Sequence, residues 1–268
     1  MFRLPTRVDF EPGCASRIPE LIRQMGSVRP LVITDPGVRS TDWFEPLIST
    51  CSSCRIEDQV SPNPKAEEVD TIAEVARSRG VDLVVGIGGG SVLDAAKAVA
   101  MLLQNPGHIN DYEGKDQFRN GSAPFIAVPT TCGTGSEVTW VSVISTPKEG
   151  RKISIKGDAM FPRFALSDAN LIRTLPPHLI AATGMDAMTH ALESLIVRGA
   201  NPVSDALATR AIFLLMGSLT SCASDPSHAA ARGNVMLAST LAGMAFGNAD
   251  VGAVHCLSES IGGLLDLP

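Results

Sequence analysis

The sequence predicts an α/β domain over residues 1–176, followed by an all-helical domain over residues 177–268. In the first part, short apolar runs alternate with segments of helical periodicity, which is the pattern of a parallel sheet covered by helices. After the run Leu175-Pro176-Pro177, Ala, Leu, Met and Gly recur at helical spacing with almost no strand signal. A chain of 268 residues is also long enough for about two domains.

The elements of the first domain can be assigned in order. Apolar runs predict strands at residues 31–34, 81–85 and 125–128, and a weaker pattern predicts an extended segment at residues 56–60. Helical patterns alternate with them, at residues 41–50, 65–79 and 91–103. The Ser-Pro-Asn-Pro run at 61–64 is typical of a turn. Residues 141–145 and 152–156, joined by the turn 146–150, are predicted to form a hairpin.

Composition excludes several classes of partner. The net charge is −6 and no basic stripe is present, so we expect neither nucleic acid nor an anionic membrane as a partner. No apolar run approaches the roughly 18 residues of a membrane span. Residues 1–10 lack the apolar core of a signal peptide, which predicts a cytoplasmic protein. The six cysteines are interpreted as reduced thiols, including the Cys51-x-x-Cys54 pair.

A glycine-rich run, Gly86-Ile87-Gly88-Gly89-Gly90-Ser91, follows a predicted strand and opens a predicted helix. Glycines let a backbone approach a diphosphate closely, and a helix N-terminus offers free N–H groups to it. Ser91 and Asp94 fit a capping box that would fix this terminus. The run is neither G-x-G-x-x-G nor a P-loop, and the alternative is a tight strand–helix turn. Because three consecutive glycines are costly for a turn alone, we favour phosphate binding.

Two further loops are candidate nucleotide contacts. Asp35 follows the first strand, where a carboxylate can accept hydrogen bonds from a ribose and repel a 2′-phosphate. By itself, an Asp before Pro36-Gly37 is more often a turn residue. The run from Pro129 to Thr139 follows a buried strand and is crowded with hydroxyls and glycines, which suits phosphate, ribose or a simple turn.

Asp186 and His190 are four residues apart in a helical run, so both side chains leave one helix face. A carboxylate and an imidazole in this arrangement can share a divalent cation, although an ordinary Asp–His pair has the same spacing. His255 lies in a second glycine-rich helical run, residues 248–263, and is the third candidate ligand. Three protein ligands are typical of a catalytic metal with one open position.

Three runs together resemble the iron-containing (group III) alcohol dehydrogenases. They begin at Gly88, Pro129 and Gly184 and read GGGSVLDAAK, PTTCGTGSEV and GMDAMTHALE, in collinear order over essentially the whole chain. The resemblance implies a dinucleotide-binding domain like that of dehydroquinate synthase, followed by a helical metal domain that is incomplete here. In the family a fourth metal ligand, a histidine, would follow Pro268, which implies a truncated and weakly active chain that exposes apolar helix faces and associates.

The resemblance also assigns residues. It implies that Asp35 is the ribose-binding acid that favours NAD, that Lys152 reaches the nicotinamide ribose, and that Glu259 replaces a substrate-side histidine involved in proton transfer. It further implies that Asp186, His190 and His255 bind Fe(II) or Zn(II). The remaining implied cofactor contacts are Asn63, Gly88, Gly89, Gly90, Ser91, Thr130, Thr131 and Thr139.

The function predicted from these features is hydride transfer between an alcohol, or an aldehyde or ketone, and NAD(H). A divalent metal would polarise the substrate oxygen. The expected partner is a small-molecule alcohol or aldehyde, and the intact protein is expected to be a homodimer. Two alternatives stay open: a non-catalytic nucleotide-binding fragment, and a metal-free reductase of the maleylacetate reductase type.

Overall fold

A six-stranded parallel sheet forms the core of the N-terminal part of the chain. The structure, a computed structural model, describes residues 2–49, 51 and 54–267. The strand order is β1-β9-β6-β4-β2-β3, and every neighbouring pair is parallel. The bounds are β1 Arg7–Asp9, β9 Phe164–Leu166, β6 Phe125–Pro129, β4 Leu83–Gly88, β2 Pro30–Ile33 and β3 Arg55–Glu57.

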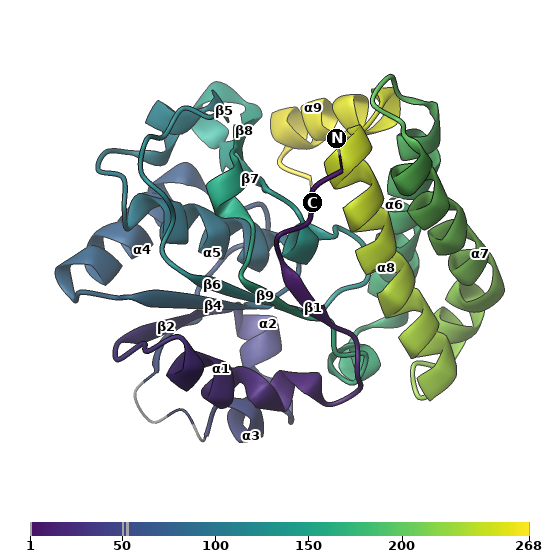
Figure 1. Cartoon of the computed structure of the whole chain (residues 1–268), viewed down its shortest axis with the longest axis horizontal. Coiled ribbons are helices and arrows are strands. Elements are labelled where there is room, and N and C mark those ends of the chain that lie inside the picture. Colours follow the sequence, from purple (N-terminus) through teal and green to yellow (C-terminus); the bar gives the residue numbers. More distant parts are fainter. Residues whose placement is uncertain (1, 50, 52–53, 268) are drawn as a thin grey trace.

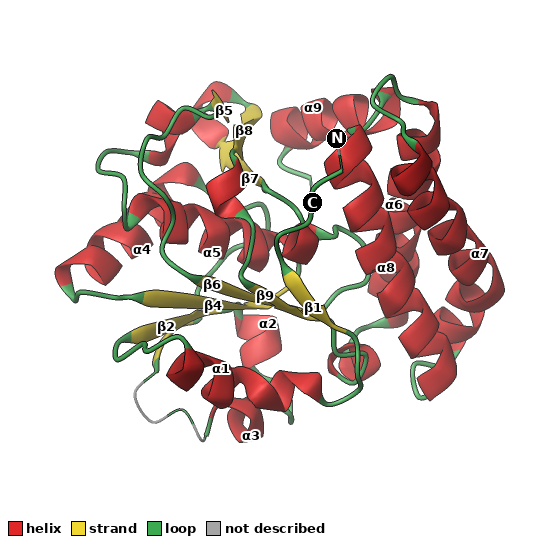
Figure 2. Ribbon diagram, in the orientation of Figure 1, coloured by secondary structure: helices red, strands yellow, loops and turns green. Residues whose placement is uncertain are grey.

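Helices cover both faces of this sheet (Figures 1 and 2). On one face lie α1 Ile18–Gln24, α2 Pro36–Arg39 and α3 Phe44–Ile48, and on the other lie α4 Ala66–Ser78 and α5 Gly90–Leu102. Successive residues of β4 point to opposite faces. Val84 therefore packs with α4 and α5, whereas Val85 and Ile87 pack with α1 and α3. The predicted α/β class is confirmed.

A second, smaller sheet lies above α5. Its order is β5-β8-β7, with β5 Gly114–Lys115, β7 Val141–Thr146 and β8 Arg151–Lys156. β7 and β8 pair antiparallel, as the predicted hairpin requires. Short 3₁₀ helices connect several elements, at Cys14–Arg17, Ile109–Tyr112, Ser136–Val138, Pro147–Glu149, Asp158–Met160 and Leu171–Thr174.

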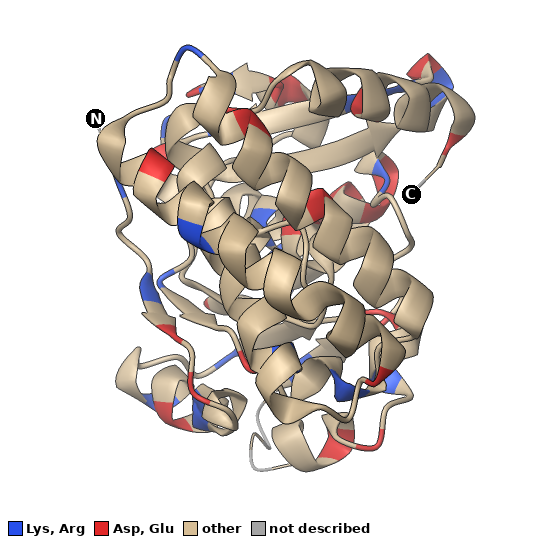
Figure 3. Cartoon of the chain, turned by 90° about the vertical axis from the view of Figure 1, so that its right-hand side faces the viewer, with Lys and Arg blue, Asp and Glu red and all other residues tan. Residues whose placement is uncertain are grey.

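From Pro177 onward, the described chain is helical. Helices α6 Pro177–Ile196, α7 Pro202–Ser224 and α8 Ala229–Ala249 pack side by side, and α9 Ala253–Leu265 crosses their end (Figure 1). Small side chains such as Ala187, Ala211 and Ala242 dominate their core and let the backbones approach closely. Figure 3 shows that this side of the molecule carries few charged residues. By length and composition, α7 could cross a membrane, although no such run was expected; it packs against α6 and α8.

Several local expectations were wrong. Of residues 41–49, only Phe44–Ile48 form a helix, α3, and residue 50 lies outside the described residues. The run 248–263 is broken between α8 and α9 where Asp250 has φ 90°. Ser91 and Asp94 form no capping box: α5 starts at Gly90, and the Asp94 carboxylate accepts hydrogen bonds from other segments instead.

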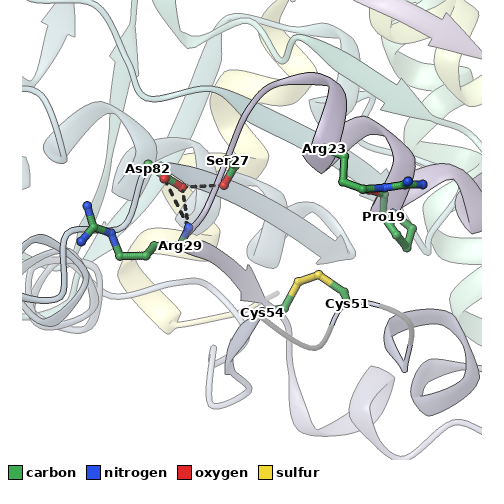
Figure 4. Close-up of a disulfide and its surroundings, with 7 residues drawn as sticks. All are labelled: Pro19, Arg23, Ser27, Arg29, Cys51, Cys54 and Asp82. Atoms are coloured by element: carbon green, nitrogen blue, oxygen red, sulfur yellow. Dashed lines mark hydrogen bonds between the residues drawn. A yellow bond between two sulfur atoms is a disulfide. The ribbon is translucent and has the colours of Figure 1, made fainter.

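Cys51 and Cys54 were expected as free thiols, but they form a disulfide (Figure 4). The loop between α3 and β3 brings their Cα atoms to 5.5 Å, inside the usual range for such a bond. The other four cysteines are free thiols. The disulfide lies in a loop at the edge of the sheet, away from the residues described next.

Candidate functional site

A cleft of about 890 Å³ lies where the C-terminal end of β4, the small sheet and helices α6, α8 and α9 meet. Nine predicted site residues line it: Asn63, Gly90, Ser91, Thr139, Lys152, Asp186, His190, His255 and Glu259. Five of the ten nucleotide candidates therefore share one cavity with the metal candidates, although they lie far apart in the sequence. The other five, Asp35, Gly88, Gly89, Thr130 and Thr131, do not line it.

The glycine run turns from β4 into α5, and Gly90 and Ser91 at the start of this helix line the cleft. A Cβ on Gly90 would lie 2.6 Å from Cγ2 of Thr134, and one on Gly89 would lie 2.9 Å from Cγ2 of Thr131. Glycine is thus required where the loop of residues 130–139 packs on this turn. The first N–H groups of a helix have no partner within the helix, so this terminus suits a diphosphate.

Two charged residues of α5, Lys97 and Asp94, tie that loop to the helix. Lys97 is 1% exposed, and its Nζ donates to the carbonyl oxygens of Ser136 (3.0 Å) and Val141 (2.5 Å). Asp94 accepts from Ser136 Oγ at 2.6 Å and from Val143 N at 2.9 Å. Burial lowers the pKa of Lys97 to about 8 and raises that of Asp94. Neither residue was predicted as functional, although a lysine among the alanines of an apolar helix indicates that its charge has a specific partner.

Asn63 and Lys152 meet at the other side of the nucleotide end. Lys152 Nζ donates to Asn63 Oδ1 at 2.9 Å, while Asn63 Nδ2 donates to the carbonyl oxygen of Leu267 at 3.0 Å. Burial lowers the pKa of Lys152. Asn63 has φ 51°, a conformation that asparagine tolerates better than most residues. The predicted contacts on the 61–64 turn and on β8 therefore lie together.

Asp35 lies at the end of β2, next to the strand that carries the glycine run. Its Oδ1 accepts the N–H of Val38 at 2.9 Å, so it caps α2. Thr130 is buried, and its N–H donates to the carbonyl oxygen of Gly88 at 2.9 Å. Asp35 and Thr130 thus make hydrogen bonds with backbone groups of the chain itself. The contacts with a ribose or a phosphate that were predicted for them stay predictions.

The three metal candidates converge on one point. One ligand atom from each of Asp186, His190 and His255 lies within 4.8 Å of the other two. Asp186 is 3.8 Å from Nδ1 of His190 and 3.4 Å from Nε2 of His255. Both ring nitrogens are buried, and neither has a hydrogen-bond partner in the described part of the chain. Two unpaired imidazole nitrogens facing one carboxylate are the donor set that a divalent cation requires.

Stacking and burial hold the imidazoles in place. The His190 ring stacks on Phe246 at 4.1 Å and on His255 at 4.1 Å between centroids. Burial lowers the pKa of His190 to about 4, so its ring is neutral at neutral pH, as a metal ligand must be. Burial raises the pKa of Asp186, but His190 and His255 outweigh it, and the net shift is downward.

Glu259 lies one helical turn after His255 on α9 and lines the same cleft. Burial raises its pKa, partly offset by His255, Lys156 and Lys152. It does not belong to the group of close ligand atoms formed by Asp186, His190 and His255. A role for Glu259 on the substrate side of a metal stays a prediction.

Comparison with known proteins identifies the family. A model described as iron-containing alcohol dehydrogenase matches residues 5–169, and one for the C-terminal part of that family matches residues 180–268. The chain belongs to the iron-containing alcohol dehydrogenase family. The resemblance seen in the three sequence runs is thereby confirmed.

Individual members of the family match the whole chain. Alcohol dehydrogenase 4 of Saccharomyces cerevisiae is 36% identical over 271 residues, which is 100% of this chain and 71% of that protein. The 1,3-propanediol dehydrogenase of Citrobacter freundii is 37% identical and covers 97% of this chain and 68% of its own length.

Solved structures agree with the fold. A 1,3-propanediol oxidoreductase superposes with a TM-score of 0.95 at 36% identity, covering 100% of this chain and 72% of the other. The sulfoacetaldehyde reductase of Bifidobacterium kashiwanohense, solved in complex with NAD+, gives 0.93 at 32% identity, over 99% of this chain and 71% of the other. The predicted fold class is therefore confirmed, and the expected NAD and iron match what the family's members are described as binding or containing.

Proposed function

We propose that this chain transfers hydride between a small alcohol, or the corresponding aldehyde or ketone, and NAD(H) with a divalent metal. The observation that carries the proposal is the pair of buried nitrogens of His190 and His255 that face Asp186 and find no hydrogen-bond partner in the described ranges of the chain. A bound Fe(II) or Zn(II) would act there as a Lewis acid on the substrate oxygen.

The chain's own residues supply binding and orientation. The glycine run and the N-terminus of α5 hold the diphosphate, Asp35 selects the ribose that lacks a 2′-phosphate, and Lys152 and Asn63 face the nicotinamide ribose. Residues 1–176 thus bind the nucleotide and residues 177–268 the metal. The proposal is supported by the residues of both parts that line one cleft, since a short hydride path requires the nucleotide and the metal to lie close together. The intact protein is a cytoplasmic homodimer in this proposal.

Glu259 completes the substrate side. Its carboxylate lies in the cleft with a raised pKa caused by burial. A group whose pKa is shifted toward neutrality can hold or pass on a proton of the substrate hydroxyl. We assign it the place that a histidine occupies in the related enzymes.

The test is NADH formation by the full 268-residue chain, loaded with Fe(II) under anaerobic conditions or with Zn(II), on ethanol, 1-propanol and 1,3-propanediol. His190→Ala should abolish turnover. His178→Ala, an exposed histidine at the start of the same helix, should leave it unchanged. Equal turnover by the wild type and His190→Ala, or turnover unaffected by a chelator, would refute the metal role.

A further inference from the structure

Glu193 is a buried carboxylate beside the proposed metal site, and no role for it follows from the sequence. We propose that Glu193 is a positioning residue that fixes the ring of His255, so that Nε2 of His255 is presented to the metal. The inference takes the metal from the proposed function, but the contacts between Glu193 and His255 are present without a metal.

Three residues of α6 share one face. Asp186, His190 and Glu193 are spaced i, i+4 and i+7, so their side chains lie along one side of the helix. Glu193 is only 4% exposed. A carboxylate this deeply buried is unfavourable unless it is fully hydrogen-bonded, and the partners of Glu193 all belong to the segment that begins α9.

The carboxylate of Glu193 makes three hydrogen bonds with that segment. Oε2 lies 2.5 Å from Nδ1 of His255 and accepts the N–H of Gly252 at 2.9 Å. Oε1 accepts the N–H of Val254 at 2.7 Å. Each carboxylate oxygen therefore accepts a backbone N–H, and Oε2 faces Nδ1 of His255 as well.

The contact with Nδ1 decides the tautomer of the neutral imidazole. Because Oε2 already accepts the backbone N–H of Gly252, it acts as an acceptor toward Nδ1 of His255 as well, and Nδ1 carries the hydrogen. Nε2 then keeps its lone pair, and this atom is the one that lies 3.4 Å from Asp186 without a hydrogen-bond partner in the described chain. Carboxylate–histidine–metal arrangements orient ligands in this manner.

The same carboxylate also fixes the start of the helix. The N-cap of α9 is Gly252, and no side chain of its own segment caps this terminus. Glu193 supplies acceptors for two of its N–H groups from another helix, where a negative charge is favourable. A Cβ on Gly252 would lie 2.7 Å from Oε1, so a larger residue there would displace this carboxylate. The position and the tautomer of His255 thus depend on one residue.

The experiment compares the wild type with Glu193→Gln, which keeps the size of the side chain but loses one acceptor oxygen. Glu74→Gln, on the exposed face of α4, is the control. Calorimetric titration with Zn(II) should give one site in all three proteins, with affinity about 10–100-fold weaker in Glu193→Gln. The metal-free proteins are also observed by ¹⁵N imidazole NMR at alkaline pH, where His255 is neutral. The wild type should show hydrogen on Nδ1, and Glu193→Gln a mixture of tautomers.

The two readouts separate this inference from the proposed function. A wild type that binds no zinc but shows the Nδ1 hydrogen, lost in Glu193→Gln, refutes the metal and supports the orientation by Glu193. A wild type whose hydrogen is on Nε2 overturns the inference, whether or not the variant folds. A third outcome is that Glu193→Gln binds zinc more weakly and shows faster amide exchange in α9, but keeps the tautomer of the wild type. Glu193 would then be only a helix cap, and the inference would also be overturned.

Discussion

At the residue scale, the site is explained by two buried ring nitrogens that have no hydrogen-bond partner among the residues that the structure describes. An unsatisfied buried polar group costs about 1–3 kcal/mol, and His190 and His255 each carry one. Stacking with Phe246 and the hydrogen bond to Glu193 hold both rings in that position. A bound cation removes this cost, because it gives both nitrogens a partner.

The spacing of these residues along the chain determines which of them could be predicted from the sequence. Asp186 and His190 are one helical turn apart, so a pattern along the chain reveals them. Glu193 and Lys97 act through backbone groups of segments distant in sequence, such as Gly252 and Val141. No periodicity encodes such a contact, and only the tertiary structure shows it.

The first prediction concerns Asp35. Asp35→Ser keeps an oxygen that can cap Val38 but removes the negative charge. We expect the ratio of NADPH to NADH dissociation constants to fall at least about tenfold, or about 1.4 kcal/mol, since the 2′-phosphate is no longer repelled. Fluorescence titration with both nucleotides measures it. Tighter binding of NADPH than NADH by the wild type would contradict the assignment.

A second prediction concerns pH and Lys97. Its pKa is about 8 in the folded chain and 10.5 ordinarily, so the buried charge is penalised below pH 8 and the penalty disappears as pH rises toward 10.5. Relative to Lys97→Met, the wild type should gain up to about 3 kcal/mol of unfolding free energy between pH 7.5 and 10.5. Urea denaturation of both proteins across this range is the measurement. A difference that is constant with pH would mean that Lys97 is not buried as a charge.

At the element scale, long elements were predictable and very short ones were not. The helix expected at residues 65–79 appears as α4, Ala66–Ser78, because its apolar positions repeat at helical spacing. β1 and β9 have three residues each and are parallel partners from opposite ends of the α/β region. A strand of three residues is too short to show an alternation of apolar and polar residues, and its partner strand is determined by the topology of the sheet.

Close packing of the cofactor loop on α8 gives the third prediction. A Cβ on Gly243 would lie 2.7 Å from Cα of Gly135, which has φ +59°. Gly243→Ala should therefore cost about 1–3 kcal/mol of unfolding free energy. Gly233→Ala on the same helix meets nothing within 4 Å and should stabilise by about 0.5–1 kcal/mol. Thermal unfolding of both variants checks the pair; a Gly243→Ala protein as stable as Gly233→Ala would contradict this packing.

At the scale of the whole molecule, two layers of structure meet in one cleft, and the site exists only where they meet. The parallel sheet presents the glycine run at its C-terminal edge, the usual place for a nucleotide in an α/β fold. The helices bring Asp186, His190 and His255 to the opposite wall. The sequence predicts both halves, but the distance between them depends on packing such as that of Gly135 on Gly243.

A fourth prediction concerns self-association. Leu257, Ile261 and Leu264 form an apolar stripe on α9 and are 64%, 52% and 72% exposed. Contiguous exposed apolar surface promotes association, whereas single exposed residues do not. The double variant Leu257→Lys/Leu264→Lys should weaken association at least about tenfold, or about 1.4 kcal/mol, by light scattering over a concentration series. Val28→Lys, at an isolated site that is 67% exposed, should not; equal effects of both would refute a role for the stripe.

The most direct test of the central claim is a crystal structure of the full chain with Zn(II) and NAD+, with anomalous scattering used to locate the zinc. The account predicts one zinc in the cleft, with an oxygen of Asp186 and a ring nitrogen of each of His190 and His255 at about 2.0–2.2 Å. Nε2 of His255 should face the metal, and Glu259 should lie beyond ligand distance on the substrate side. A zinc bound elsewhere, or bound in the cleft without His190 and His255, would contradict the account.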